Sequence, residues 1–382
     1  MMVPGFVKAF AATPAAVPGG KKLVVLQLSG GNDGLNTVIP VRNDLYYAGR
    51  PGLAITRAES LALDDELALN PVMTGMKSLY DQGLLTVLNG VGYPQPNRSH
   101  FRSMDIWQTG SGAGELWTTG WLGRYLDASA KGGSARQALA IEVDDSLSLS
   151  MKGADHKALA IRDARAFYNA ARTPEFASLA ARHQDEHAAS LPDYLYKTLR
   201  ETISSAEYVH ERFGAGRPTQ TYPDTAIGKR MKTIASLMLG KADTQVFYAA
   251  HGSFDTHSGQ RGRQDRLLKE LDEALSAFVA ELKAAGLMND VLIMTFSEFG
   301  RRVAQNASGG TDHGTAAPVF MISGALRKSG IFNPLPSLQD LDEGDLKYSI
   351  DFREVYATVL GQWLETKADP ILGKYYKPLA FI

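Results

Sequence analysis

The sequence predicts an α/β protein: a three-layer α/β/α sandwich with a mostly parallel sheet and a helical insertion. Two observations support this fold class. Short apolar runs that end at glycine or polar residues recur along the chain, as buried parallel strands do. Amphipathic segments of helical period separate several of these runs, and this alternation is typical of βαβ units. The predicted strands cover residues 23–28, 84–88, 138–143, 158–161, 244–249, 291–296 and 319–322.

The helices are predicted from the spacing of apolar residues. Residues 71–82 repeat their apolar side chains at helical spacing. Residues 261–285 carry a longer apolar stripe from Leu267 to Leu282, and Gly286 follows as a C-terminal cap. Both segments are therefore expected to pack on a face of the sheet.

Length and composition indicate the domain organisation. A chain of 382 residues can form one large or two ordinary domains, and we predict a single domain over residues 23–382. Residues 163–239 carry many charges and few strand-like runs, which indicates a helical insertion. Residues 334–348 are predicted as a surface loop and residues 351–365 as a closing helix.

The first 22 residues form a leader rich in alanine and proline. They lack the charged start and the long apolar core of a signal peptide. Two interpretations stay open, a flexible N-terminus and the remnant of an export signal that has been removed.

Composition excludes several classes of function and of site. A net charge of −1 and a pI of about 6.7 argue against a broad surface for nucleic acid. The chain has no apolar stretch of the roughly 18 residues that a membrane span needs. Cysteine is absent, so a metal would be held by Asp, Glu, His or Asn with water, which suits Zn, Mn, Mg or Ca.

Acids and histidines follow three of the predicted strands, and a further pair lies in a glycine-rich loop. Ligands of open α/β sheets bind beyond the carboxyl ends of the strands, so these positions favour metal binding or catalysis. The residues are Asn32, Asp33, Asp255, His257, Glu298, Asp312 and His313.

Each of these positions also has a structural interpretation. Glycines around Asp33 allow a close approach to a ligand, but Asn-Asp-Gly is also ordinary turn chemistry. Asp255 and His257 are two apart and can chelate one ion from extended backbone, or they form a buried pair. Glu298 at a strand end would be costly if buried alone, so a metal or an arginine, either Arg301 or Arg302, is expected beside it.

Residues 97–101 lead into a further helical pattern. Ser99 there is either an N-cap or a nucleophile at a helix N-terminus, where unpaired N–H groups and the helix dipole favour a phosphate or sulfate. Arg98 and His100 beside it could hold the oxygens of a substrate or supply a proton. A serine-protease triad is disfavoured because no Gly-x-Ser-x-Gly elbow is present.

Taken together, these motifs resemble the exported bacterial family called domain of unknown function 1501, a distant branch of the alkaline phosphatase-like superfamily. The resemblance covers the chain from about residue 23 to the C-terminus. It rests on LSGGNDGLNT (28–37), NRSHF (97–101), FDTH (254–257), SEFGR (297–301) and GTDHGTA (310–316). Members usually carry twin-arginine export signals. No twin-arginine pair occurs in the first 22 residues, but residues 3–6 resemble the segment after such a signal, so we expect a periplasmic or otherwise exported protein.

The resemblance implies a two-metal site with assigned roles. Asp33 looks like the first acid, Ser99 like the nucleophile and Glu298 like the acid after the late strand. Asp255 and His257 look like the pair that holds the second metal, and His313 looks like its final histidine.

Two departures from the superfamily pattern affect these roles. Phe299 stands where the superfamily has a histidine, and the spacing of Asp255 and His257 is shorter than usual. Two alternatives stay open: His100 or Asp312 supplies the missing ligand, or one ion alone binds.

The function expected from the resemblance is metal-dependent hydrolysis of phosphate or sulfate esters, with a small-molecule or glycan ester as the substrate. Ser99 would attack, and Asn32, Arg98 or Arg301 would hold the non-bridging oxygens. The ion would be Zn, with Mn, Ca and Mg as alternatives, in one or two copies. The main rival is a non-catalytic envelope protein that binds a metal or an anionic glycan beside a partner protein. A third reading is a purely structural fold with ion pairs at the strand ends.

Overall fold

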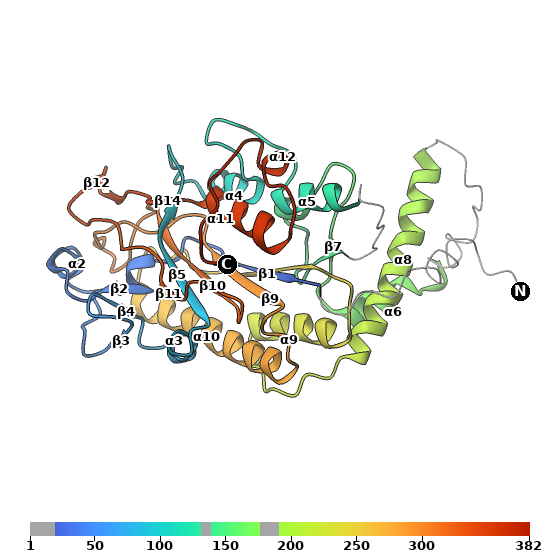
Figure 1. The fold of residues 1–382 in the computed structure, drawn as a ribbon, viewed down its shortest axis with the longest axis horizontal. Coiled ribbons are helices and arrows are strands. Elements are labelled where there is room, and N and C mark those ends of the chain that lie inside the picture. Colours follow the sequence, from blue (N-terminus) through green and yellow to red (C-terminus); the bar gives the residue numbers. More distant parts are fainter. Residues whose placement is uncertain (1–19, 131–138, 176–190) are drawn as a thin grey trace, which may run out of the picture.

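The computed structural model describes residues 20–130, 139–175 and 191–382 (Figure 1). Most of the predicted leader lies outside these residues. A nine-stranded sheet runs through the described part of the chain in the order β11-β5-β10-β9-β1-β8-β6-β7, and β14 pairs with β5. The strands are β1 (Lys22–Leu28), β5 (Leu85–Gly92), β6 (Ala140–Glu142), β7 (Leu159–Ala160), β8 (Val246–His251), β9 (Val291–Phe296), β10 (Ala317–Ile322), β11 (Gly330–Ile331) and β14 (Ile350–Asp351).

The register explains how distant loops meet at one edge of the sheet. β1 is parallel to β8 and to β9, with Leu28 opposite His251 and Gln27 opposite Phe296. The loops after these three strands therefore leave the same edge. β10 is antiparallel to β5 and β9, so its first residue, Ala317, lies opposite Val91 near the end of β5. The segment before β10 consequently reaches that edge as well. The prediction of a mostly parallel sheet is confirmed, with β10 as the exception.

Helices cover both faces of the sheet, which confirms the three layers (Figure 1). Alternate residues of β1 show the division: Val24 and Leu26 belong to one buried cluster, and Leu23 and Val25 belong to the other. Burial of side chains of this size contributes roughly 1.5–3 kcal/mol each. The first cluster packs under α3 (Thr74–Asp81), α9 (Ala226–Leu239) and α10 (Gln260–Ala284), and the second under α4 (His100–Thr109), α5 (Trp121–Ala130), α11 (Phe352–Thr358) and α12 (Asp369–Leu372).

The long helix α10 follows the predicted apolar stripe. Its residues from Leu267 to Leu282 that form the stripe are buried in the first cluster. Gly286, just beyond its end, adopts a φ of 71°. That left-handed conformation is the one that a glycine after a helix supplies.

Residues 163–239 are helical wherever the structure describes an element in them. They form α6 (Ala164–Ala171), α8 (Leu191–Ala215) and α9. Buried residues of α9, such as Ile227 and Ile234, belong to the first core cluster, so this helix is part of the layer on the sheet. The insertion boundaries stay a prediction. None of the described helices is long and apolar enough to span a bilayer.

Smaller elements surround this frame. The predicted surface loop contains a hairpin of β12 (Leu341–Asp342) and β13 (Asp345–Leu346). The closing helix is shorter than predicted, because α11 ends at Thr358 and a single π-helical turn follows. The sequence pattern did not predict a three-stranded sheet of β2 (Val38–Pro40), β4 (Leu67–Leu69) and β3 (Leu61–Ala62), or the short helix α2 (Asp44–Gly49).

Candidate metal centre

Loops from three parts of the chain meet beyond the carboxyl end of the sheet. Asp255 and His257 lie after β8, His313 lies before β10, and His100 is the first residue of α4. Gly30 allows the loop after β1 to lie against the loop after β8, because a Cβ at Gly30 would lie 2.5 Å from the backbone nitrogen of Asp255. Its φ of 115° is also one that side chains disfavour.

One carboxylate oxygen lies at the centre of the cluster. Oδ1 of Asp255 is 3.0 Å from Nε2 of His257, 3.2 Å from Nε2 of His313 and 3.4 Å from Nε2 of His100. The Nε2 atoms of His257 and His313 are 2.9 Å apart. Three imidazole nitrogens therefore surround a single acidic oxygen.

The other ring nitrogen of His100 is held by a carboxylate. Its Nδ1 lies 2.9 Å from Oε1 of Glu298. Glu298 is completely buried, and the same oxygen accepts a 2.8 Å hydrogen bond from the backbone of Gly30. The bond to Glu298 raises the pKa of His100 above its ordinary value, against the effect of burial. Glu298 therefore orients His100 and does not itself face the centre.

The two other histidines are oriented in the same way. Nδ1 of His313 lies 2.7 Å from the carbonyl oxygen of Arg98, and Nδ1 of His257 lies 3.2 Å from Oδ1 of Asp312. Each acceptor favours the tautomer with its proton on Nδ1. The lone pair of each Nε2 then faces Asp255. Metal-ligating histidines commonly donate their second N–H to a carboxylate or carbonyl in this manner.

The charge state of Asp255 fits a ligand. Burial would raise its pKa, but the hydrogen bond from Arg301 and the contact with His313 outweigh burial and bring the pKa to about 2. Asp255 is therefore ionised at neutral pH. Close to half of its side chain, 46%, is exposed. The carboxylate is thus both charged and partly exposed.

The residues present fit a cation. His100, Asp255 and His313 offer ligand atoms that lie within 4.8 Å of one another. Nε2 of His100 is buried and has no hydrogen-bond partner in the described chain, because its 3.4 Å contact with Asp255 is poorly aligned. Zinc takes mixed histidine and carboxylate ligands at about 2.0–2.2 Å, so a small inward shift would be needed to coordinate it.

Arg301 was predicted to hold substrate oxygens, but its guanidinium is almost fully used within the protein. It is 2% exposed and donates to the carbonyls of Gly31 at 2.6 Å and Thr311 at 2.9 Å. It also reaches Phe254 at 3.1 Å and Oδ1 of Asp255 at 2.7 Å. Arg301 therefore joins the loops and fixes Asp255.

Asp33 lies in a closed network away from the histidines. Its side chain is completely buried and pairs with Arg50 at 2.5 Å. Gln260 donates to the same oxygen, and the backbone of Leu35 donates to the other at 3.1 Å. No contact joins Asp33 to the histidine cluster in the described part of the chain. The structure therefore does not place Asp33 as the metal ligand that the sequence predicted.

Asn32 is equally enclosed. Its backbone donates to Ser297 at 2.9 Å, its amide donates to Thr37 at 2.9 Å, and its Oδ1 accepts from Gln264 at 3.2 Å. The side chain is buried, so it does not reach the open side of the cluster. Asn32 holds the loop after β1.

Ser99 stands at the surface beside the cluster, where it precedes the first residue of α4. Its backbone is fixed on both sides, by the bond from His313 to the carbonyl of Arg98 and by the placement of His100. Ser99 is exposed, makes no side-chain cap, and its hydroxyl has no partner among the described residues. The hydroxyl is therefore exposed and is not used to cap α4.

The guanidinium of Arg98 is turned to the β12–β13 hairpin. It donates to Asp345 at 2.6 Å and to Glu343 at 3.3 Å. The guanidinium of Arg98 is therefore not placed to hold substrate oxygens or to supply a proton. Arg98 contributes to the centre through its carbonyl, which accepts from His313.

Two residues of this region were missed from the sequence. Arg50 neutralises Asp33, and Asn306 donates 3.1 Å and 3.0 Å hydrogen bonds to Asp312 and to the carbonyl of His257. Neither carries a pattern that could have revealed it. Arg50 lies 17 residues from Asp33 at the end of α2, and Asn306 lies 6 and 49 residues from its two partners.

Known proteins were compared with this chain in three ways. No curated protein matches it. Three solved structures illustrate what it is similar to. The sulfatase PsFucS1 from Pseudoalteromonas sp. has 11% identity and a TM-score of 0.40, with 98% of this chain and 72% of that chain covered. The phosphonate monoester hydrolase SpPMH from Silicibacter pomeroyi has 10% identity and a TM-score of 0.42, with 94% and 77% covered. The lipoteichoic acid synthase LtaP from Listeria monocytogenes has 11% identity and a TM-score of 0.38, with 91% and 80% covered.

These TM-scores are low, so the description of the fold rests on this chain's own sheet. The family comparison is more direct. The model described as "Protein of unknown function (DUF1501)" matches residues 20–371, which is most of the sequence and includes every motif of the centre. The chain therefore belongs to the DUF1501 family.

Proposed function

We propose that this protein is a metal-dependent hydrolase of phosphate or sulfate esters. One observation carries the proposal: three imidazoles are held at Nδ1 and direct Nε2 toward one ionised oxygen of Asp255. Arg301 donates to that oxygen and its guanidinium lies 3.4 Å from Nε2 of His257, so one cation already faces part of the cluster. The lone pairs of His100 and His313 would still face a carboxylate oxygen, which is unfavourable unless a metal ion or a proton lies between them.

The ion would be held by Asp255, His313 and His100, with His257 as the fourth ligand. A set rich in imidazole suits Zn better than Ca or Mg, which prefer oxygen ligands, and Mn is the next candidate. One ion is proposed instead of two, because Arg50 already neutralises Asp33. When bound, the ion would supply positive charge that stabilises the negative charge developing on the substrate.

Ser99 is proposed as the nucleophile. Its oxygen would form a bond to phosphorus or sulfur while the ester oxygen leaves and takes up a proton. Water would then release phosphate or sulfate from Ser99. The first N–H groups of α4 have no partners within the helix, so they can hold the non-bridging oxygens in place of the occupied Arg98 and Arg301.

The Ser99→Ala variant tests the nucleophile. Wild-type protein loaded with Zn should hydrolyse an aryl phosphate or an aryl sulfate, and Ser99→Ala should lower kcat by at least about a thousandfold. The bound Zn, measured by mass spectrometry, should stay the same. The matched control is Ser308→Ala, an exposed serine in the loop before β10. Full activity of Ser99→Ala would remove Ser99 from the mechanism.

A second candidate is a non-catalytic protein that binds a metal or an anionic glycan in the envelope, beside a partner protein. The closed pairing of Asp33 with Arg50 favours it, because a two-metal hydrolase would need that acid. Absence of turnover on any ester, together with retained Zn binding, would select this candidate. Export to the periplasm belongs to both proposals, and detection of the protein in a periplasmic extract would test it.

A further inference from the structure

A cavity of about 390 Å³ adjoins the metal centre and shares a wall with it. Phe299 lines the cavity, and its ring centroid lies 4.8 Å from that of His100 and 4.7 Å from that of His313. Asn97 also lines it and accepts a 2.9 Å hydrogen bond from the backbone of Ser99. The rest of a substrate held at Ser99 can therefore extend into this space.

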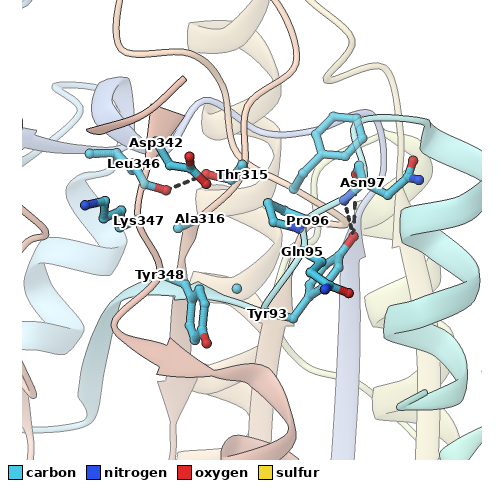
Figure 2. Close-up of a pocket in the computed structure, with 12 residues that line it drawn as sticks. Tyr93, Gln95, Pro96, Asn97, Thr315, Ala316, Asp342, Leu346, Lys347 and Tyr348 are labelled. Carbon is cyan, nitrogen blue, oxygen red and sulfur yellow. Dashed lines mark hydrogen bonds between the residues drawn. The ribbon is translucent and has the colours of Figure 1, made fainter. Parts of the chain in front are cut away.

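Aromatic and aliphatic side chains form most of the cavity surface. Figure 2 shows the rings of Tyr93 and Tyr348 on two sides of the space, with Pro96 close to Asn97. Tyr348 keeps 41% of its surface exposed. Gly92 allows its approach, because a Cβ at Gly92 would lie 2.9 Å from Cβ of Tyr348.

The polar groups of the cavity are uncharged amides and one free acid. Gln95 and Asn97 contribute amides, and Asp342 contributes a carboxylate. Lys347 is the one cation among the described residues that line the cavity, and it is bonded to Asp340. The cavity therefore offers no unpaired positive charge to a second anionic group.

These features specify a ligand class. The exposed ring of Tyr348 favours a ring in the ligand, while the amides donate and accept hydrogen bonds with hydroxyl groups and the carboxylate accepts them. A volume of about 390 Å³ lies in the range of small-molecule sites. We propose that the cavity binds the alcohol part of the ester, and that this part is an uncharged, hydroxylated ring such as a pyranose sugar. That this ring is part of an ester rests on the function proposed above, whereas binding of the ring to the cavity does not.

The first experiment measures binding without catalysis. Saturation-transfer NMR with a panel of methyl pyranosides should detect a binder of the full-length protein, and Tyr348→Ala should abolish the signal. Gly92→Ala, which displaces Tyr348, should weaken it. The matched control is Tyr375→Ala, because Tyr375 is 67% exposed and outside the cavity. If no pyranoside binds, or if Tyr348→Ala binds as well as wild type, the proposal is overturned.

The second experiment measures specificity. The ratio of kcat/KM for a pyranose phosphate over methyl phosphate should fall between about 2-fold and 12-fold in Tyr348→Ala, which is the loss expected for one aromatic contact. Tyr375→Ala, outside the cavity, should leave both values of kcat/KM as in wild type. An unchanged ratio in Tyr348→Ala overturns the cavity proposal and leaves the hydrolase proposal intact.

The two failures can be told apart. Pyranoside binding that depends on Tyr348, in a protein that hydrolyses no ester, would keep the cavity and reject the hydrolase. His313→Ala, which removes a ligand of the centre, should retain pyranoside binding for the same reason. Tighter binding of phenols than of pyranosides would overturn the choice of a sugar.

Discussion

Two aspartates follow neighbouring parallel strands at the same edge of the sheet, yet their surroundings are opposite. Asp33 is sealed in the protein and pairs with one permanent cation, Arg50. Asp255 is nearly half exposed, and the oxygen that accepts from Arg301 also has three imidazole nitrogens within 3.4 Å. Position at a strand end therefore does not identify a ligand. The neighbouring side chains do, because imidazole nitrogens beside a carboxylate can bind a metal ion, whereas a guanidinium cannot.

The largest effect is expected at the closed aspartate. Asp33→Asn leaves Arg50 buried without a counter-charge, and breaking a buried pair in this way costs about 3–5 kcal/mol. The free energy of unfolding in urea, with EDTA present, should show this loss. Zn stoichiometry of the folded variant should match wild type. Loss of the metal with little loss of stability would reverse the roles assigned to the two aspartates.

A third buried acid extends the comparison to a carboxyl whose pKa is raised by burial. Glu142 is 3% exposed, and burial raises its pKa to about 7, with only partial relief from hydrogen bonds of Ser148. Its folded pKa lies above the ordinary value, so its stabilising contribution is complete below about pH 4.5 and is lost as the pH rises through 7.

That contribution amounts to about 3 kcal/mol, because one pKa unit corresponds to about 1.4 kcal/mol. Unfolding curves of wild type should therefore show falling stability between pH 5 and pH 8. Glu142→Gln should flatten that part of the profile. An equal slope in the variant would show that Glu142 is not the responsible group.

At the open aspartate the expected loss is in metal affinity. Asp255→Ala removes the oxygen on which the three Nε2 atoms converge, so the Zn dissociation constant should rise about a hundredfold, or about 2.7 kcal/mol. Global stability in EDTA should change by less than that of Asp33→Asn. Added Zn should raise the Tm of wild type and not that of Asp255→Ala. Equal Zn-induced shifts in Tm would exclude Asp255 as a ligand.

The sequence predicted the strands of the sheet better than it predicted the surroundings of the two aspartates. Apolar runs such as 291–296 specify strands because their burial leaves no alternative. The antiparallel course of β10 was not predictable from its own residues, and it is this course that carries His313 to the other ligands. The partner of Asp33 lies 17 residues away in a polar turn, so nothing in the sequence separated the closed acid from the open one.

The smallest effect is expected one step outside the ligands. Glu298→Gln keeps an oxygen that can accept from His100 but removes the charge that orients the ring and strengthens it as a ligand. Loss of such an outer partner commonly costs between about 10-fold and 100-fold in metal affinity, and the low end is expected here because the hydrogen bond survives. Zn titration against a competing chelator measures it.

The control is Glu281→Gln, which makes the same change at an acid that is 3% exposed and bonded to the backbones of Thr219 and Gln220, away from the centre. The ¹⁵N spectrum of His100 gives a second readout, since a purely structural glutamate would leave the proton on Nδ1 undisturbed. If Glu298→Gln binds Zn as tightly as Glu281→Gln, then the role of Glu298 is to hold Gly30 and the loop after β1. The start of α4 alone would then orient His100.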